Sequence, residues 1–302
     1  MKDKYTPLFV IIAASLWGVD GIVLTPNLYT LPVPLVVLLN SAVVSVLLIP
    51  FIYKHFPAIK NLSAKDYFSF VGVAIFGGAI GTMAITKALF YVNYVNLSIV
   101  MLIQKLQPLF AIILASIVLK EKLSAKFFLW GLFAIAGAYL MTFGINLPDL
   151  DTGDKTLMAA SFALLAAVSF GSSTVFSKRA LKNTGFELGT YLRFLFTAII
   201  MLVIVSVSGD YNSISEISDR QIIIFLLIAC TTGAPAIFLY YYGLKKISAS
   251  SATIYELAFP LTAVILEYFL RGKLLNSFQW IGVLILVFSI VKVTRLNNSN
   301  KK

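Results

Sequence analysis

The sequence contains few of the residues on which soluble enzymes depend. Only 12% of its 302 residues are charged, about half the share that is typical of a soluble domain. It has one cysteine, Cys230, and one histidine, His55, which excludes an intramolecular disulfide and leaves little for thiol or metal chemistry. No stretch matches a phosphate loop, a dinucleotide glycine pattern or a metal-binding helix motif. We therefore expect no enzyme activity, no metal and no cofactor.

Long apolar runs are what the chain has in excess. Hydrophobic residues make up 59% of the sequence, and the mean hydropathy is +0.92. Since about 20 helical residues cross the hydrocarbon core of a bilayer, the runs predict an all-α polytopic membrane protein. The ten predicted segments are residues 7–25, 33–53, 67–90, 97–119, 126–145, 157–177, 188–208, 221–243, 249–270 and 277–294.

The basic residues gather in alternate connections between these segments. If the N-terminus lies inside, the outer loops hold only four of them, Lys155, Arg220, Arg271 and Lys273. The positive-inside rule then predicts a multi-pass protein of the bacterial cytoplasmic membrane with both termini in the cytoplasm. It also explains the net charge of +11 without a nucleic-acid partner.

An internal repeat is visible across the longest polar connector, residues 146–156. Trp17-Gly18 aligns with Phe170-Gly171, and Pro108 aligns with Pro260. Five segments on each side predict ten transmembrane helices as two inverted five-helix repeats, residues 1–150 and 151–302. Inverted repeats bury the substrate site near the midplane, where the halves meet.

Two related segments organise this prediction, residues 97–123 and 249–274, and each contains a proline near its middle. Pro108 and Pro260 each remove a backbone donor and free the carbonyl four residues earlier, at Gln104 and Glu256. Polar groups within a bilayer need a protein partner or a water-filled cavity. We therefore expect both segments to be broken and to line a central cavity.

Lys105 and Glu256 are the most distinctive ionisable pair within the predicted membrane segments. A charge at this depth costs at least about 2.5 kcal/mol, so each needs a reason. One interpretation is an acid and a base that grip a substrate or exchange a proton with it. The alternative is a buried ion pair that fixes helix packing and adds little net stability.

Further cavity candidates carry the same two readings. Gln104, Gln107 and Tyr255 either line the cavity or join helices by hydrogen bonds. Asp20, beside Trp17, is either a protonation site, since burial disfavours its charged form, or a structural partner of Lys87 or Arg193. Arg193, about one turn into its helix, is predicted to snorkel to the cytoplasmic face, and the Lys120-Glu121-Lys122 run is predicted to anchor the fourth segment there.

The motifs together resemble the drug/metabolite transporter superfamily, in its ten-helix branch built from two EamA repeats. The resemblance is carried by Trp17-Gly18, by LQPLFAIILASIVLKEKL with Pro108 and Glu121, by AFPLTAVILEYFL around Pro260, and by LGTYLRFLFTAIIM. Three departures leave the substrate open. Asn40, a further cavity candidate, stands where the second repeat has Arg193; Gly272 stands where a glutamate is frequent; and Lys105 is not a general family feature.

The predicted function is secondary transport by alternating access between the two halves. An acid and a base at neighbouring depths suit a small polar or zwitterionic, amino-acid-like metabolite, and the resemblance implies export coupled to protons. The expected partners are this small molecule, the lipid bilayer and protons, and the sequence leaves the oligomeric state open. Two alternatives are an exporter of lipophilic cations or drugs, which Lys105 would disfavour, and a non-transporting membrane scaffold or enzyme subunit.

Overall fold

The structure, a computed structural model, describes residues 5–91, 100, 103–147, 155–272 and 275–299. All regular elements in these ranges are helical. In chain order they are α1 (Thr6–Val19), η2 (Asp20–Leu24), η3 (Thr25–Leu28), α2 (Val33–Ile52), η4 (Tyr53–Asn61), α3 (Ala64–Val73), η5 (Ala74–Ile80), α4 (Gly81–Tyr91), α6 (Gln107–Val118), α7 (Ala125–Phe143), α8 (Thr156–Ala180), α9 (Phe186–Ser208), η6 (Asp210–Glu216), α10 (Asp219–Ile228), η7 (Ala229–Gly233), α11 (Ala234–Lys246), α12 (Ala249–Tyr255), α13 (Ala258–Arg271) and α14 (Ser277–Ser299).

The helices confirm the prediction of a polytopic, all-α membrane protein. Among the described residues, nine helical stretches are long and apolar enough to cross a membrane, and a shorter apolar helix covers Gln107–Val118. Nine of the ten predicted segments correspond to these stretches, eight of them to within three residues, and the stretch that begins at Val33 continues to Asn61 through η4. Helix α6 lies in the remaining segment, residues 97–119. The start of that segment lies outside the described residues.

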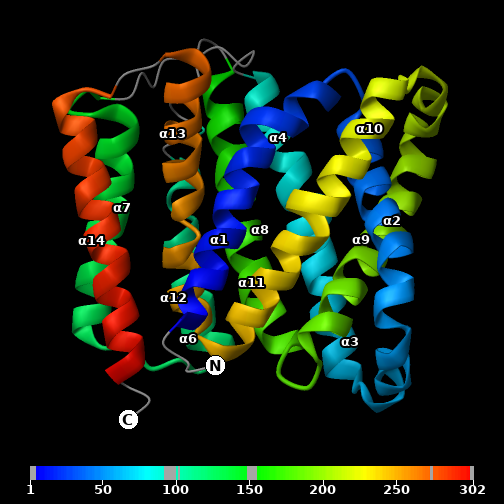
Figure 1. The fold of residues 1–302 in the computed structure, drawn as a ribbon, viewed down its shortest axis with the longest axis horizontal. Helices are drawn as coiled ribbons and strands as arrows, with labels where there is room; N and C mark the ends of the chain where they lie inside the picture. Colours follow the sequence, from blue (N-terminus) through cyan, green and yellow to red (C-terminus); the bar gives the residue numbers. More distant parts are fainter. Residues whose placement is uncertain (1–4, 92–99, 101–102, 148–154, 273–274, 300–302) are drawn as a thin grey trace.

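The helices stand side by side as a bundle (Figure 1). The end of the bundle where α1 begins and α14 ends is the lower end in Figure 1 and is called the N-face below. The pair α7 and α14 forms one edge of the bundle, whereas α2, α9 and α10 lie toward the other edge. Helices α1, α8 and α11 lie between these edges.

Helices at corresponding positions in the predicted repeats pack against corresponding neighbours. Helix α1 packs on α11 and α13, and its counterpart α8 packs on α4 and α6. The pairs α2 with α9 and α7 with α14 join equivalent helices of the two halves. Local irregularities repeat as well, since π-helical turns occupy both η5 and η7 and capping boxes begin both α3 and α10, at Ser63 and Ser218.

Both proline-containing segments are broken as predicted. Helix α12 ends at Tyr255 and α13 starts at Ala258, so Glu256 and Leu257 form a turn. In the other half, Lys105 and Leu106 form a turn directly before α6. The expectation of a free Glu256 carbonyl was wrong, because the Phe259 amide, 2.9 Å away, donates to it. A tighter turn therefore replaces the bond that Pro260 cannot make.

Two glycines bring straight helices against these breaks. A Cβ atom on Gly18 of α1 would lie 2.9 Å from the Phe259 carbonyl oxygen, at the start of α13. A Cβ atom on Gly171 of α8 would lie 2.9 Å from the Ala111 nitrogen and 3.1 Å from the Gln107 oxygen of α6. Gly18 and Gly171, which align in the predicted repeat, thus make similar close contacts, each with a helix next to a break.

We predict that Gly171→Ala destabilises the fold because the added methyl meets backbone atoms that cannot move freely. Overpacking of this kind costs about 1–3 kcal/mol. The control is Gly131→Ala in α7, where the new Cβ would be 3.6 Å from Ile254 Cδ1, and where the gain in helix propensity is up to about 1 kcal/mol. Unfolding of both variants in mixed detergent–SDS micelles tests this, and equal unfolding midpoints would contradict it.

Candidate functional site

A hydrogen-bonded polar cluster surrounds the carboxylate of Glu256 at the break between α12 and α13. The Tyr240 hydroxyl donates to Oε1 over 2.6 Å, and the Thr174 hydroxyl lies 3.2 Å from the same oxygen. Gln107 Nε2 donates to Oε2 over 2.9 Å. Three helices, α6, α8 and α11, thus meet the α12–α13 turn at the Glu256 carboxylate. We call Gln107, Thr174, Tyr240 and Glu256 the Glu256 cluster.

Aromatic side chains form the adjoining wall. The Trp17 ring lies 5.2 Å from the Tyr240 ring, centroid to centroid, and is only partly buried. Tyr241 is fully buried, and its hydroxyl is 3.0 Å from the Ser177 hydroxyl. Tyr255 is also fully buried, within the apolar core, so it packs between helices. Of the two aromatic candidates predicted from the sequence, Trp17 and Tyr255, it is Trp17 that lies against Tyr240 of the cluster.

Arg193 of α9 points into the bundle toward this cluster. Its guanidinium lies 5.8 Å from the centroid of the Tyr241 ring. A Cβ atom on Gly77 would stand 3.8 Å from its Nη2 atom and in contact with the Ser173 side chain. The Tyr241 ring lies 5.9 Å, centroid to centroid, from the ring of Tyr240, whose hydroxyl donates to Glu256. The prediction that Arg193 snorkels to the cytoplasmic face was therefore wrong, because the space left by Gly77 and the Tyr241 ring hold it inside.

Lys105 does not pair with Glu256, which corrects the expectation of a structural ion pair. Its side chain is buried, with 9% relative exposure, and it forms no ion pair with any described residue. The reason is the break itself. Lys105 lies in the turn before α6, whereas Gln107, two residues later, reaches the Glu256 carboxylate. The predicted depth in the membrane could not show whether Lys105 or Gln107 would face Glu256.

The remaining candidates lie outside the Glu256 cluster. Asp20 accepts a hydrogen bond from Thr25 Oγ1 at 3.1 Å and forms no ion pair with Lys87 or Arg193. Asn40 of α2 has a buried Oδ1 atom without a hydrogen-bond partner among the described residues. Gln104 is partly buried and forms no hydrogen bond with the cluster. Pro108 and Pro260 lie in the first turns of α6 and α13.

Glu121 has a role that the sequence prediction missed. Its carboxylate accepts hydrogen bonds from the backbone of Ala249 at 2.7 Å and of Ser250 at 3.1 Å, and from the Ser250 hydroxyl at 2.6 Å. An anion at a helix N-terminus satisfies unpaired amides and opposes the helix dipole. Glu121 thus holds the start of the short helix α12, which carries Glu256 at its other end, and the run 120–122 is more than a charged anchor.

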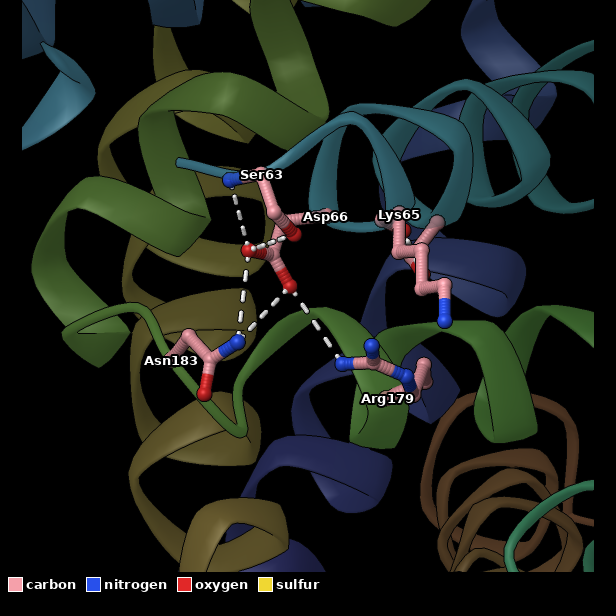
Figure 2. Close-up of polar contacts among 6 residues, drawn as sticks. Ser63, Lys65, Asp66, Arg179 and Asn183 are labelled. Carbon is pink, nitrogen blue, oxygen red and sulfur yellow. Dashed lines mark hydrogen bonds and ion pairs between the residues drawn. The ribbon is translucent and has the colours of Figure 1, made fainter. Parts of the chain in front are cut away.

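A second polar cluster joins α3 to the α8–α9 connection at the N-face (Figure 2). Asp66 forms an ion pair with Arg179 at 3.3 Å and accepts hydrogen bonds from Asn183 and from the backbone and hydroxyl of Ser63. Asp66 is almost fully buried, with 1% side-chain exposure. Asp66 and Arg179 form the one ion pair found among the described residues. This pair lies apart from the Glu256 cluster.

The Glu256 cluster has the side chains needed to bind a small molecule. It offers carboxylate acceptors and an amide donor beside an aromatic wall, and the Arg193 guanidinium lies over the neighbouring Tyr241 ring. Within the described ranges, no group of three His, Cys, Asp or Glu side chains is arranged to hold a metal ion, and the expectation of no cofactor stays a prediction. The fold and the site together define a multi-span membrane protein with an internal polar site.

Comparison with known proteins identifies the family. The model of the EamA-like transporter family matches residues 4–143 and again residues 157–295. The chain belongs to the EamA-like transporter family, within the drug/metabolite transporter superfamily, as the resemblance predicted. A solved crystal structure superposes with a TM-score of 0.75 over 99% of both chains at 14% identity, which supports the fold alone.

Named relatives are transporters. The riboflavin transporter ImpX of Fusobacterium nucleatum subsp. nucleatum is 45% identical over 291 residues, covering 96% of this chain and 97% of that protein. The uncharacterized transporter YwfM of Bacillus subtilis is 25% identical over an alignment of 320 residues, which covers 100% of this chain and 97% of that protein. Family and relatives are transporters, not enzymes, so this chain is a membrane transporter for a small molecule.

We predict that Asp66→Asn weakens the fold because it removes the ion pair to Arg179 and leaves buried donors without an anionic acceptor. The loss should be about 1–3 kcal/mol. Lys65→Gln is the control, since Lys65 is exposed and points away from the Asp66 carboxylate (Figure 2), and surface changes stay within about 0.5 kcal/mol. Unfolding in mixed micelles measures both, and an unchanged Asp66→Asn midpoint would refute the role of this cluster.

Proposed function

We propose that this chain transports riboflavin, or a flavin closely related to it, across the cytoplasmic membrane. The observation that carries the proposal is the 45% identity to a riboflavin transporter over 96% of the chain. Relatedness at this level and coverage makes a shared substrate class the simplest expectation. The site must then accept a flat, three-ring heteroaromatic head with a hydroxylated chain.

The side chains around Glu256 support this substrate class. Trp17 is partly exposed and lies against Tyr240, and aromatic pairs of this kind bind flat rings by stacking. Glu256, Gln107 and Thr174 supply hydrogen-bonding groups directly beside that wall. Aromatic surface with a few convergent polar groups is the usual composition of a small-molecule site.

The route across the membrane follows from the paired halves. We propose that residues 1–150 and 151–302 act as inverted repeats whose relative movement exposes the site alternately to each side, with both termini in the cytoplasm. The repeated packing of α1 with α13 and of α8 with α6 supports such a movement. Export and coupling to protons, which the sequence analysis favoured, remain predictions.

An amino-acid-like substrate is the second candidate. It rests on an acid and a base at neighbouring depths, and Lys105 and Glu256 form no ion pair with each other. Lys105 is nevertheless a buried cation without a described ion-pair partner, so a carboxylate-bearing substrate keeps one specific observation in its favour. The same assay separates the two candidates.

The test uses purified protein in sealed liposomes and follows riboflavin by its own fluorescence. We expect the protein to accelerate riboflavin movement over empty liposomes, and Glu256→Gln to slow it by roughly 10- to 100-fold, because hydrogen bonds to a charged group contribute about 1.5–3 kcal/mol. Glu216→Gln makes the same chemical change in the exposed helix η6 and should leave transport unchanged.

Three comparisons decide between the readings. A pool of amino acids in excess should leave the movement of riboflavin unchanged, and labelled amino acids followed in parallel should not move. Imposed pH gradients of either sign test proton coupling and direction. Well-folded protein that moves an amino acid and not riboflavin would overturn the flavin proposal in favour of the second candidate, and movement of neither would overturn both.

A further inference from the structure

Arg193 keeps its hydrogen-bonding capacity unused. Its side chain is partly buried in the bundle, over the Tyr241 ring and beside Gly77. It forms no side-chain hydrogen bond and no ion pair with any residue that the structure describes. A guanidinium carries five N–H donors. Since Arg193 is only partly buried, these donors are available to an acceptor that is not part of the described protein.

Glu256 has the complementary capacity to accept. An ionised carboxylate offers about four lone-pair positions. Oε1 is occupied by Tyr240 and Thr174, whereas Oε2 receives the Gln107 amide alone among the groups that the structure describes. One acceptor position on Oε2 is therefore open to a donor from outside the described protein.

The two residues belong to one polar region but do not neutralise each other directly. Arg193 lies over the ring of Tyr241. The centroid of that ring is 5.9 Å from the centroid of the Tyr240 ring, and the Tyr240 hydroxyl donates to Glu256. A donor group and an acceptor group thus lie beside neighbouring tyrosines, with no ion pair between them. A ligand that fits both must present an acceptor next to a donor.

We infer that Arg193 and Glu256 recognise the imide edge of the substrate, the C(=O)–NH–C(=O) group of a pyrimidinedione ring. The imide N–H donates to Glu256 Oε2, and an imide carbonyl accepts from the Arg193 guanidinium. This inference rests on the proposed function, because the flavin head carries such an edge. It makes Arg193 a specificity-determining residue of the site.

The alternative is a purely structural arginine. Tyr241, whose ring it covers, is already fixed by complete burial and by contact with the Ser177 hydroxyl. The equivalent position in the first half is Asn40, on the helix that packs against α9. Helix α2 thus presents a buried polar atom without a described partner at the position equivalent to Arg193, which packing alone does not explain.

The experiment measures ligand binding to the intact protein in nanodiscs by quenching of flavin fluorescence. Riboflavin is compared with N3-methylriboflavin, which keeps the rings and the chain but lacks the imide donor. We expect the methyl group to weaken binding to the wild type by about tenfold or more, as loss of a charge-assisted hydrogen bond does. In Glu256→Gln riboflavin binds more weakly, and the difference between the two ligands falls to within about twofold.

Arg193 is tested in parallel. Arg193→Gln should weaken riboflavin binding by about tenfold or more, and Arg193→Lys should restore only part of it, because a guanidinium donates in a planar fork that an ammonium lacks. Arg220→Gln is the matched control, an exposed arginine that bonds Asn27 at the opposite face, and it should bind both flavins as the wild type does. Monodisperse elution and an unchanged unfolding midpoint establish that each variant is folded.

Equal affinity of the wild type for both flavins, or full affinity in folded Arg193→Gln, would overturn the inference while leaving riboflavin transport in place. If the wild type binds no riboflavin, the proposed function fails separately. Thermal-shift measurements with uridine, lumichrome and their N3-methyl forms then decide the inference. Binding that the N3-methyl group abolishes supports imide recognition, and binding of none of them rejects it.

Discussion

The structure depends on how a break in a membrane helix is made tolerable. Backbone groups within a bilayer must find partners inside the protein, and a proline removes one of them. At Glu256 the missing bond is replaced by the Phe259 amide, and at the other end of the same short helix Glu121 accepts the amides of Ala249 and Ser250. With both ends satisfied, seven residues of α12 can stand as a separate helix and present a carboxylate between four elements. The close contacts at Gly18 and Gly171 then fix where the broken helices lie.

The two halves share this backbone plan but not its polar side chains. In the aligned register, Glu256 corresponds to Gln104, Gln107 to Phe259 and Arg193 to Asn40. Each half therefore contributes differently to the interior. Gln107 comes from one half and Thr174, Tyr240 and Glu256 from the other. Within the described residues, these unequal side chains build the Glu256 cluster at the break of the second half.

Much of the fold follows from patterns that a sequence records directly. Apolar length gives the spans, and the two prolines give the breaks, because both effects are local. The site residues depend on how the helices are rotated about their axes, which a break alters. Spacing placed Lys105 and Glu256 at neighbouring depths, yet the turn at Lys105 brings Gln107 to the acid. Gln107 was among the candidates, whereas Thr174 and Tyr240 were not, since a hydroxyl within an apolar run carries no distinguishing signal.

Two charged residues near helix ends, Arg193 and Glu121, have environments that the local sequence does not indicate. Snorkelling is the ordinary outcome for an arginine one turn from a helix end, and only the space beside Gly77 and the ring of Tyr241 show that Arg193 turns inward. The same holds for Glu121, whose basic neighbours resemble a topology signal. Its partners are amides more than 120 residues later in the chain. In both residues tertiary contacts override a local rule that is correct on average.

The links that join the halves at the two ends of the bundle are chemically unequal. At the N-face, the capping box of α3 is extended by Asp66 to Asn183 and to the charged Arg179. At the opposite face, the equivalent box of α10 reaches Thr30 through Gln221, a neutral contact of 2.9 Å. A buried charge left without its partner is far more costly than an unpaired amide. On the proposed alternating-access movement, separating the halves at the N-face therefore breaks an ion pair whose carboxylate is almost fully buried. Separation at the opposite face breaks the hydrogen bonds of Gln221 to Thr30 and of Arg220 to Asn27, and Arg220 is already exposed to solvent. On that proposal, the buried ion pair favours a bundle that remains closed at the N-face.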